Sequence, residues 1–335
     1  MPTVADVAAR AGVSVGTVSK AMNGRGQLRA QTRERVLEAA RELGFHPNAL
    51  ARGLLTGRTY TVGVLTTESF GRFTIPIMLG VEDALGAGEI STLLCDSRDD
   101  PLREQHYVRT LLSRRVDGIV VTGRRRDPRP PIGELPIPVV YVFAVSESPS
   151  DLSITYDDEQ GAELAVNHLL LTGRTRVAHV TGPRRHLSAR LREGGARAAL
   201  AAAGLDFVAG GALWGEWSEV WGREAAHILL RSGEPFDGVF CGSDQIARGV
   251  ADTLREAGRA VPGDVALVGF DNWDVMAEAC RPPLTTIDPN LSELGRVAAG
   301  RLLRAIEGGA IEPGRILLPC DLVIRQSTSA APAAV

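Results

Sequence analysis

The chain has 335 residues, of which 44% are hydrophobic and 23% are charged, which is typical of a globular protein with two or three domains. The absence of any apolar run of about 18 residues excludes a transmembrane helix. The N-terminus, MPTVADVAARAGVS, lacks the pattern of a secretory signal, so we expect a cytoplasmic protein. Four widely separated cysteines without a CxxC pair predict neither a disulfide framework nor a zinc site: Cys95, Cys241, Cys280 and Cys320.

The net charge of −3 divides unevenly along the chain. Residues 1–60 carry nine basic and four acidic side chains, a net charge of +5, whereas the remainder carries 28 basic and 36 acidic ones, a net charge of −8. A basic segment attached to an acidic body favours a polyanionic partner that binds at one end only. Lys20, the single lysine beside 36 arginines, lies in this basic segment.

Residues 3–44 predict three short helices. Thr3 and Asp6 have the spacing of a capping box, Gly12 ends the first helix, and Ser14 is placed to cap the second. The third helix is expected from about Gln31 to Leu43. The side chains expected to face inward are Val4, Val7, Ala8, Ala11, Val18, Met22, Val36, Leu37, Ala40 and Leu43.

The first two helices, joined at residues 11–13, form a predicted helix-turn-helix. The outward face of the second helix carries small and polar groups that allow close approach to a DNA major groove, and hydroxyls and an amide nearby suit phosphate oxygens. The candidate DNA-binding residues are Thr3, Ser14, Val15, Gly16, Thr17, Ser19, Lys20 and Asn23. A three-helix capping domain is the alternative, and the charge of +5 and the uncovered polar face count against it.

After residue 60, short apolar runs alternate with amphipathic segments of about ten residues. This alternation predicts two parallel sheets with helices on both faces. The expected strands are Thr61–Leu65, Ser91–Cys95, Gly118–Val121, Pro138–Phe143, Arg176–Thr181, Gly238–Cys241, Val265–Phe270 and Arg315–Leu318. The run STSAAPAAV, which begins at Ser327, is small and polar and predicts a disordered tail.

The sequence TVADVAARAGVSVGTVSKAMNG resembles the headpiece of the LacI/GalR (lactose-repressor) family, and CGSDQIARG, VPGDVALVGFDN and PPLTTIDPN extend the resemblance over residues 2–327. The resemblance implies an all-α helix-turn-helix headpiece joined to an α/β core of two doubly wound parallel-sheet lobes, as in type I periplasmic binding proteins. The implied segments are a headpiece at 1–46, a hinge helix and linker at 47–59, a core at 60–327 and a disordered tail at 328–335. Within the core, lobe one covers about 60–157 and 288–317, and lobe two covers about 158–287 and 318–327.

The hinge segment Asn48–Leu55 is too short for a stable isolated helix. The resemblance implies that two copies pair on DNA and that Leu54 wedges between base pairs in the minor groove. The alternative is a linker residue that packs on its own core. Gly53 and Arg29 depart from the family pattern: the glycine weakens the hinge helix, and the arginine replaces a capping serine.

The resemblance also implies a ligand cleft between the lobes, at the carboxyl ends of the strands. Arg192 would bind hydroxyls or a carboxylate, Asp271 would accept from ligand hydroxyls, Ser243 would contact ligand, and Asp244 would anchor the following helix. Phe73 and Trp221 would line the cleft or, alternatively, fill the core, which is the expected role of Trp214 and Trp217. Ala144 stands where some sugar-binding members carry a carboxylate, which weakens any assignment of one sugar.

We therefore predict a homodimeric DNA-binding transcriptional repressor, released from a near-palindromic operator by a small sugar-like effector, without cofactor, metal or membrane. Regulation by a co-repressor, or activation, uses the same parts and stays open. No GxSxG, GxxxxGK[ST] or HExxH pattern favours an enzyme, and the acid pairs at 99–100 and 157–158 are interpreted as solvated turn or cap residues. A solute-binding protein without DNA function would not account for the headpiece.

Overall fold

The computed structural model describes residues 2–22, 28–45, 58–68, 71–86 and 90–329. The chain forms two compact units, Met1–Thr61 together with Arg115–Asp117, and Val62–Arg114 together with Gly118–Val335. Among the described helices, none is long and apolar enough to cross a membrane.

The described part of the N-terminal unit contains three helices: α1 (Val4–Ala11), α2 (Val15–Met22) and α3 (Ala30–Glu42). The predicted capping box is present, because the Thr3 hydroxyl accepts from the Asp6 N–H and the Asp6 carboxylate accepts from the Thr3 N–H. Gly12 ends α1 in the left-handed conformation, with φ of 64°, and so makes the tight turn to α2. Arg29 precedes α3 without a side-chain cap, as its departure from serine predicted.

A small apolar core holds the three helices together. Its buried members are Val7, Ala8, Ala11, Val18, Ala21, Val36, Ala39 and Ala40. Val4 was expected to face inward, but it is 36% exposed because it lies one turn before Val7, beyond the edge of this core. Leu37 is only partly buried, and Ala39 is the buried residue in its place.

The first sheet of the core has the strand order β13-β7-β5-β3-β1-β2. Its strands are β1 (Thr61–Thr66), β2 (Ser91–Asp96), β3 (Gly118–Val121), β5 (Val139–Val142), β7 (Leu152–Tyr156) and β13 (Gly314–Leu318). The pairings β1–β3, β3–β5, β5–β7 and β7–β13 are parallel. Its helices are α5 (Thr74–Leu85), α6 (Pro101–Ser113) and α12 (Leu291–Ile306), and α12 packs closely against α5 because Gly80 leaves room for the Ser292 carbonyl.

The second sheet has the order β14-β12-β11-β10-β8-β9, parallel from β9 to β12 and antiparallel between β12 and β14. Its strands are β8 (Val177–Thr181), β9 (Leu213–Trp214), β10 (Gly238–Cys241), β11 (Ala266–Phe270), β12 (Thr285–Asp288) and β14 (Asp321–Val323). Its helices are α7 (Asp158–Leu171), α8 (Leu187–Ala202), α9 (Glu219–Ser232), α10 (Asp244–Glu256) and α11 (Asp274–Ala277). A short pair, β4 (Pro128–Arg129) and β6 (Val145–Ser146), and a 3-10 turn, η1 (Val208–Gly210), complete the core.

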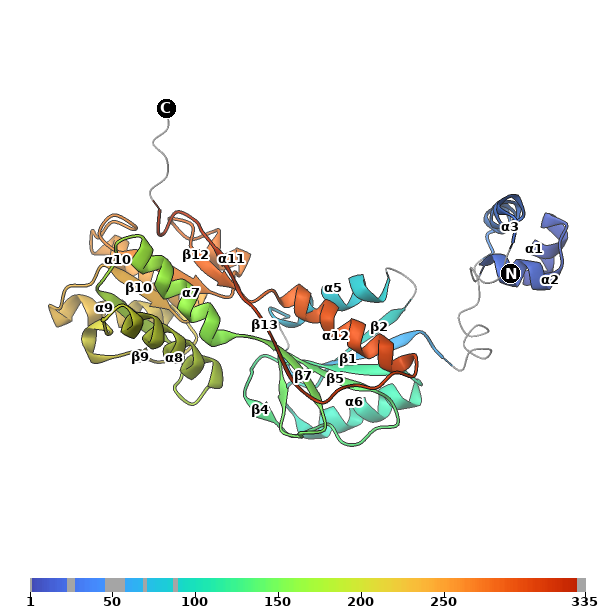
Figure 1. The fold of residues 1–335 in the computed structure, drawn as a ribbon, viewed down its shortest axis with the longest axis horizontal. Coiled ribbons are helices and arrows are strands. Elements are labelled where there is room, and N and C mark those ends of the chain that lie inside the picture. The colour runs from blue at the N-terminus through green and yellow to red at the C-terminus, as the bar shows by residue number, and fades with distance from the viewer. Residues whose placement is uncertain (1, 23–27, 46–57, 69–70, 87–89, 330–335) are drawn as a thin grey trace, which may run out of the picture. The chain divides into compact units, whose positions relative to one another are not determined.

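The chain passes between the two lobes of the core three times, from β7 to α7, from β12 to α12 and from β13 to β14 (Figure 1). The helical headpiece and the two parallel-sheet lobes confirm the predicted fold class. Parallel sheets of this kind bind ligands beyond the carboxyl ends of their strands, which directs attention to the region between the lobes.

Two parts of the core differ from the sequence prediction. The strand prediction relied on short apolar runs and therefore missed β7, whose segment LSITY alternates apolar and polar residues, and β12, whose segment TTID has one apolar residue, although nearly all of these side chains are buried in the sheets. The short strands β4, β6, β9 and β14 were also not predicted. The tail is also ordered further than expected. The Ser327 hydroxyl donates to the Leu267 carbonyl at 2.6 Å, and the Thr328 hydroxyl lies 2.8 Å from the His168 ring and 2.7 Å from Thr285. Residues 330–335 lie outside the described residues.

Candidate functional site

The outer face of α2 is polar and open to solvent. Val15 is 51% exposed, Gly16, Ser19 and Lys20 are exposed, and Thr17 is partly buried. The Ser14 hydroxyl accepts from the Thr17 N–H at 3.2 Å and lies 2.9 Å from the Thr17 hydroxyl, so it caps the helix as predicted. The helix therefore presents small groups and one lysine on a face that the headpiece core does not use, a geometry suited to a DNA groove.

Two other candidate DNA-binding residues, Asn23 and Leu54, lie outside the described residues, as does the whole hinge segment. The structure therefore leaves their predicted roles as predictions. Thr3 is described, and its side chain is engaged in the capping box of α1 rather than left unpaired.

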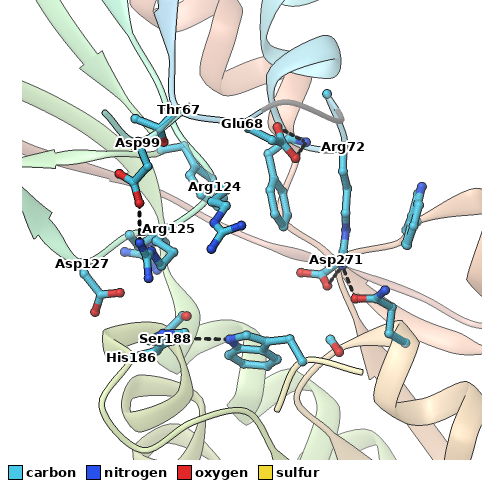
Figure 2. A pocket seen from close by; sticks show the side chains of 18 of the residues that line it. Thr67, Glu68, Arg72, Asp99, Arg124, Arg125, Asp127, His186, Ser188 and Asp271 are labelled. Atoms are coloured by element: carbon cyan, nitrogen blue, oxygen red, sulfur yellow. Dashed lines mark hydrogen bonds and ion pairs between the residues drawn. The ribbon is translucent and has the colours of Figure 1, made fainter. Parts of the chain in front are cut away.

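A cavity of about 1070 Å³ lies in the core between the lobes. Its wall includes segments that follow β1, β3 and β5 in lobe one and β8, β10 and β11 in lobe two, as expected for the carboxyl ends of parallel strands. Figure 2 shows Arg72 and Asp271 on one side and Arg124, Arg125 and His186 on the other. Phe73, Arg192, Ser243 and Asp271, four of the five predicted effector residues, lie on this wall.

Arg192 belongs to a buried charge cluster at the wall of the cavity. Its Nε donates to Asp158 at 2.8 Å, a second nitrogen donates to the Tyr156 hydroxyl at 2.9 Å, and a third donates to the Gly242 carbonyl. Asp158 also pairs with Arg126, so one carboxylate serves two guanidinium groups. Asp157 caps α7 as predicted, but the interpretation of Asp158 as solvated is corrected, because its side chain is fully buried between the two arginines.

Arg72 connects the two lobes. Its guanidinium pairs with Asp271 and donates to the Gln245 side chain at 3.0 Å, and it lies 4.8 Å from the centre of the Phe73 ring and 4.6 Å from that of the Trp273 ring. Asp271 also lies 3.7 Å from Arg192. In this structure the Arg72 guanidinium thus pairs with the Asp271 carboxylate, which the sequence analysis assigned to ligand hydroxyls.

Ser243 and Asp244 follow β10 at the start of α10. The Ser243 hydroxyl caps the helix by accepting from the Ile246 N–H at 3.3 Å, and Ser243 also lines the cavity. Asp244 accepts from the Trp273 N–H at 2.8 Å and from the Thr286 hydroxyl at 2.6 Å, which confirms its predicted anchoring role. Complete burial, with the Asp271 carboxylate nearby, raises the pKa of Asp244 to about 8.

Trp217 and Trp221 have different surroundings in the structure. The Trp221 indole donates to the Thr181 carbonyl at 2.9 Å and its ring packs on Gly215, so Trp221 is not among the residues that line the cavity. Trp217, expected to fill the core, lines the cavity instead and donates to Nδ1 of His186 at 2.8 Å. Phe73 also lines the cavity and stacks on Phe143 with ring centres 4.7 Å apart.

Sequence reasoning missed several residues of the cavity wall, among them Arg72, His186, Trp273 and the run Arg124–Arg126. A signal for the arginine run was present, because it directly follows the strand Gly118–Val121 and the ends of parallel strands form ligand sites. In the described part of the chain, no group of three or more His, Cys, Asp or Glu side chains is placed to hold a metal ion.

Comparisons with known proteins agree with this division of the chain. Residues 3–48 match the model for bacterial regulatory proteins of the lacI family, and residues 166–328 match a periplasmic binding protein-like domain. The ribose operon repressor of Escherichia coli is 35% identical over 331 residues, which cover 98% of this chain and all of that protein. The chain belongs to the lacI family. It is therefore a DNA-binding transcriptional regulator, and members of this family are regulators rather than enzymes.

Other lacI-family relatives cover the chain equally well. The regulator CelR of Thermobifida fusca is 34% identical over 97% of this chain and 98% of its own length. Among solved structures, the complex of the regulator CelR with cellobiose has a TM-score of 0.68 at 32% identity, covering 98% of this chain and all of that chain. The lac repressor dimer bound to operator and the anti-inducer ONPF has a TM-score of 0.71 at 29% identity, covering 98% of this chain and 99% of that chain. This lacI-family chain thus shares the architecture of headpiece and core along its full described length.

Proposed function

We propose that this lacI-family regulator is a homodimeric repressor whose operator affinity is controlled by a small hydroxylated effector bound in the core cavity. The observation that carries the proposal is the presence, in one chain, of an exposed polar recognition helix and a large polar cavity between two lobes. The relatives named for ribose, and the CelR structure with cellobiose, support an effector of the sugar class.

Two headpieces of a dimer would place two α2 helices in successive major grooves, which calls for a near-palindromic operator. We assign residues 1–46 to the headpiece, 47–59 to the hinge and 60–327 to the core, and we place the protein in the cytoplasm, where its DNA is. On this assignment, Val15, Gly16 and Lys20 approach base edges, Ser14 and Thr17 with Asn23 approach phosphates, and Leu54 of the paired hinges enters the minor groove. The exposed face of α2 supports the proposed contacts of the headpiece, and the family pattern of the hinge supports the proposed contact of Leu54.

Effector control requires that the ligand bind the two arrangements of the lobes with different affinity. Arg72 supplies a contact that depends on that arrangement, because it comes from lobe one and pairs with Asp271 and Gln245 of lobe two. A ligand whose hydroxyl groups compete for Asp271 would displace this pair and change how the lobes meet. Release from the operator is the expected direction.

The decisive experiment selects binding sites for the full chain from a random DNA duplex library and then measures its affinity for the enriched sequence. We expect an inverted repeat, and we expect Leu54→Ala to weaken binding to that repeat far more than binding to unrelated DNA. Asp271→Asn keeps an acceptor oxygen for Arg72, so it should retain operator affinity, and the loss of the carboxylate charge should weaken the response to effector. Recovery of no common sequence, or equal losses on both DNAs for Leu54→Ala, would contradict the proposal.

A further inference from the structure

The cavity wall is rich in arginine. It carries seven arginines and five carboxylates: Arg72, Arg98, Arg124, Arg125, Arg126, Arg185 and Arg192 against Glu68, Asp99, Asp127, Glu216 and Asp271. The two groups are not spread evenly. One side holds Arg72 with Asp271, and the opposite side holds Arg124, Arg125 and His186 (Figure 2). We call the latter three residues the arginine end.

The carboxylates near the arginine end are already engaged with protein donors. Asp99 pairs with Arg125 at 2.7 Å, and Asp127 accepts from the Leu187 N–H at 2.8 Å. These carboxylates therefore do not neutralise Arg124, which is exposed and makes no hydrogen bond or ion pair with any described residue. A positive group facing the cavity is therefore left for a ligand.

Among the described residues, two buried donors beside the arginine end also lack acceptors. His186 is 9% exposed, and its Nδ1 accepts from the Trp217 indole, so the proton of the neutral ring is on Nε2, which has no partner. Burial lowers the pKa of His186, which keeps the ring neutral and this tautomer in place. The Nε of Arg126, a residue only 2% exposed, also has no partner. Buried donors without acceptors are uncommon and call for an acceptor that the chain itself does not supply.

The local backbone adds to this preference. Helix α8 begins at Leu187, directly after His186, and Ser188 in its first turn lines the cavity. The N-terminus of a helix carries partial positive charge and favours an anion. The Asp127 carboxylate of lobe one already accepts from the Leu187 N–H at the N-terminus of α8, so a carboxylate is accommodated at this helix end.

We propose that the effector carries an anionic group, a phosphate or a carboxylate on a hydroxylated carbon skeleton, and that this group binds at the arginine end while hydroxyl groups bind near Asp271. Guanidinium groups bind both kinds of oxyanion through paired N–H donors. The cavity of about 1070 Å³ has room for a hexose derivative. This inference rests on the proposed role of the cavity as the effector site.

Inorganic phosphate is the first probe, titrated into the full chain at constant ionic strength set with NaCl. Tryptophan fluorescence reports binding, because Trp217 and Trp273 line the cavity and all four tryptophans belong to residues 214–273 of the core. The test variant is Arg124→Gln/Arg125→Gln. The matched control is Arg109→Gln/Arg231→Gln, which removes two exposed arginines of α6 and α9 that do not line the cavity. Thermal unfolding of each variant confirms that it folds.

We expect saturable phosphate binding by the wild-type chain and by the control, with affinity at least about tenfold weaker in the test variant. Absence of saturable binding, or equal affinity in both variants, would overturn the inference. A hexose 6-phosphate and a hexonate then distinguish the two sources of the anion, and each should bind at least tenfold more tightly than the neutral hexose. A neutral hexose that binds as tightly as both would also overturn the inference.

Failure of the regulatory proposal gives a different result. If an anionic compound binds in a manner that depends on Arg124 and Arg125 but leaves the affinity for the selected operator unchanged, the anion site stands and effector control by that compound does not. If a neutral sugar releases the operator and no anion binds, effector control stands and the anion site does not.

Discussion

Asp158→Asn is the substitution for which the structure predicts the largest loss of stability. The wild-type carboxylate pairs with both Arg126 and Arg192, and the side chains of the three residues are 0%, 2% and 4% exposed. Asparagine keeps the shape and one acceptor oxygen but removes the only negative charge that the two arginines share directly. Arg126 would then stay charged in the core, since burial lowers its pKa only to about 10.

The expected cost follows from breaking a buried ion pair while leaving its partners in place. Such a change costs about 3–5 kcal/mol, because an uncompensated charge remains away from water. For a domain of this size, each kcal/mol lowers the midpoint of thermal unfolding by about 2–4 °C, so the midpoint should fall by roughly 6–20 °C. The neighbouring Asp157→Asn is the matched control. Asp157 caps α7, and asparagine caps a helix about as well as aspartate, which limits the expected change to about 0.5 kcal/mol.

Thermal unfolding of the full chain, followed by near-ultraviolet circular dichroism, measures both variants under one condition. The core tryptophans and tyrosines report the transition, so the headpiece does not dominate the signal. If Asp158→Asn unfolds within about 2 °C of Asp157→Asn, the two arginines do not depend on this carboxylate, and the account of the cluster is refuted.

Three further predictions concern other parts of the chain. Operator affinity should fall by at least about 10³-fold between 50 and 200 mM salt because basic headpiece residues displace counterions, and a flat response would count against the DNA-binding face. Thr3→Ala should lower the hydrogen-exchange protection of α1 amides about fivefold, the equivalent of about 1 kcal/mol for a lost cap, and unchanged protection would contradict this. Burial lowers the pKa of His179 to about 4, so the unfolded chain binds its proton first and stability falls as the pH drops from about 6.5 to 4. His179→Asn should remove roughly 3 kcal/mol of this fall, as urea unfolding at several pH values would show, whereas parallel pH profiles would disprove it.

Local signals in the sequence were sufficient for the headpiece and for most of the sheets. The capping box at Thr3, the glycine turn at Gly12 and the runs of apolar residues are properties of neighbouring residues, and each appears in the structure where the pattern predicts it. Strands β7 and β12 were missed because they are not apolar runs: LSITY alternates apolar and polar residues, and TTID has a single apolar residue. Their serine and threonine side chains are buried by the lobes that flank them, which no local spacing reveals.

The motifs along the chain were enough to predict a basic helix-turn-helix followed by a two-lobed α/β core, and they pointed to candidate residues at the ends of the strands. What those residues contact follows from the tertiary structure alone. Asp158 lies beside a helix cap in the sequence, yet Arg126 and Arg192, from two distant segments, meet on it. Trp217 and Trp221 are four residues apart, and the family resemblance placed Trp221 in the cleft, but in the structure Trp217 lines the cavity and Trp221 does not. Burial and pairing across such distances depend on how the lobes pack, and that packing is set by the whole chain rather than by any one motif.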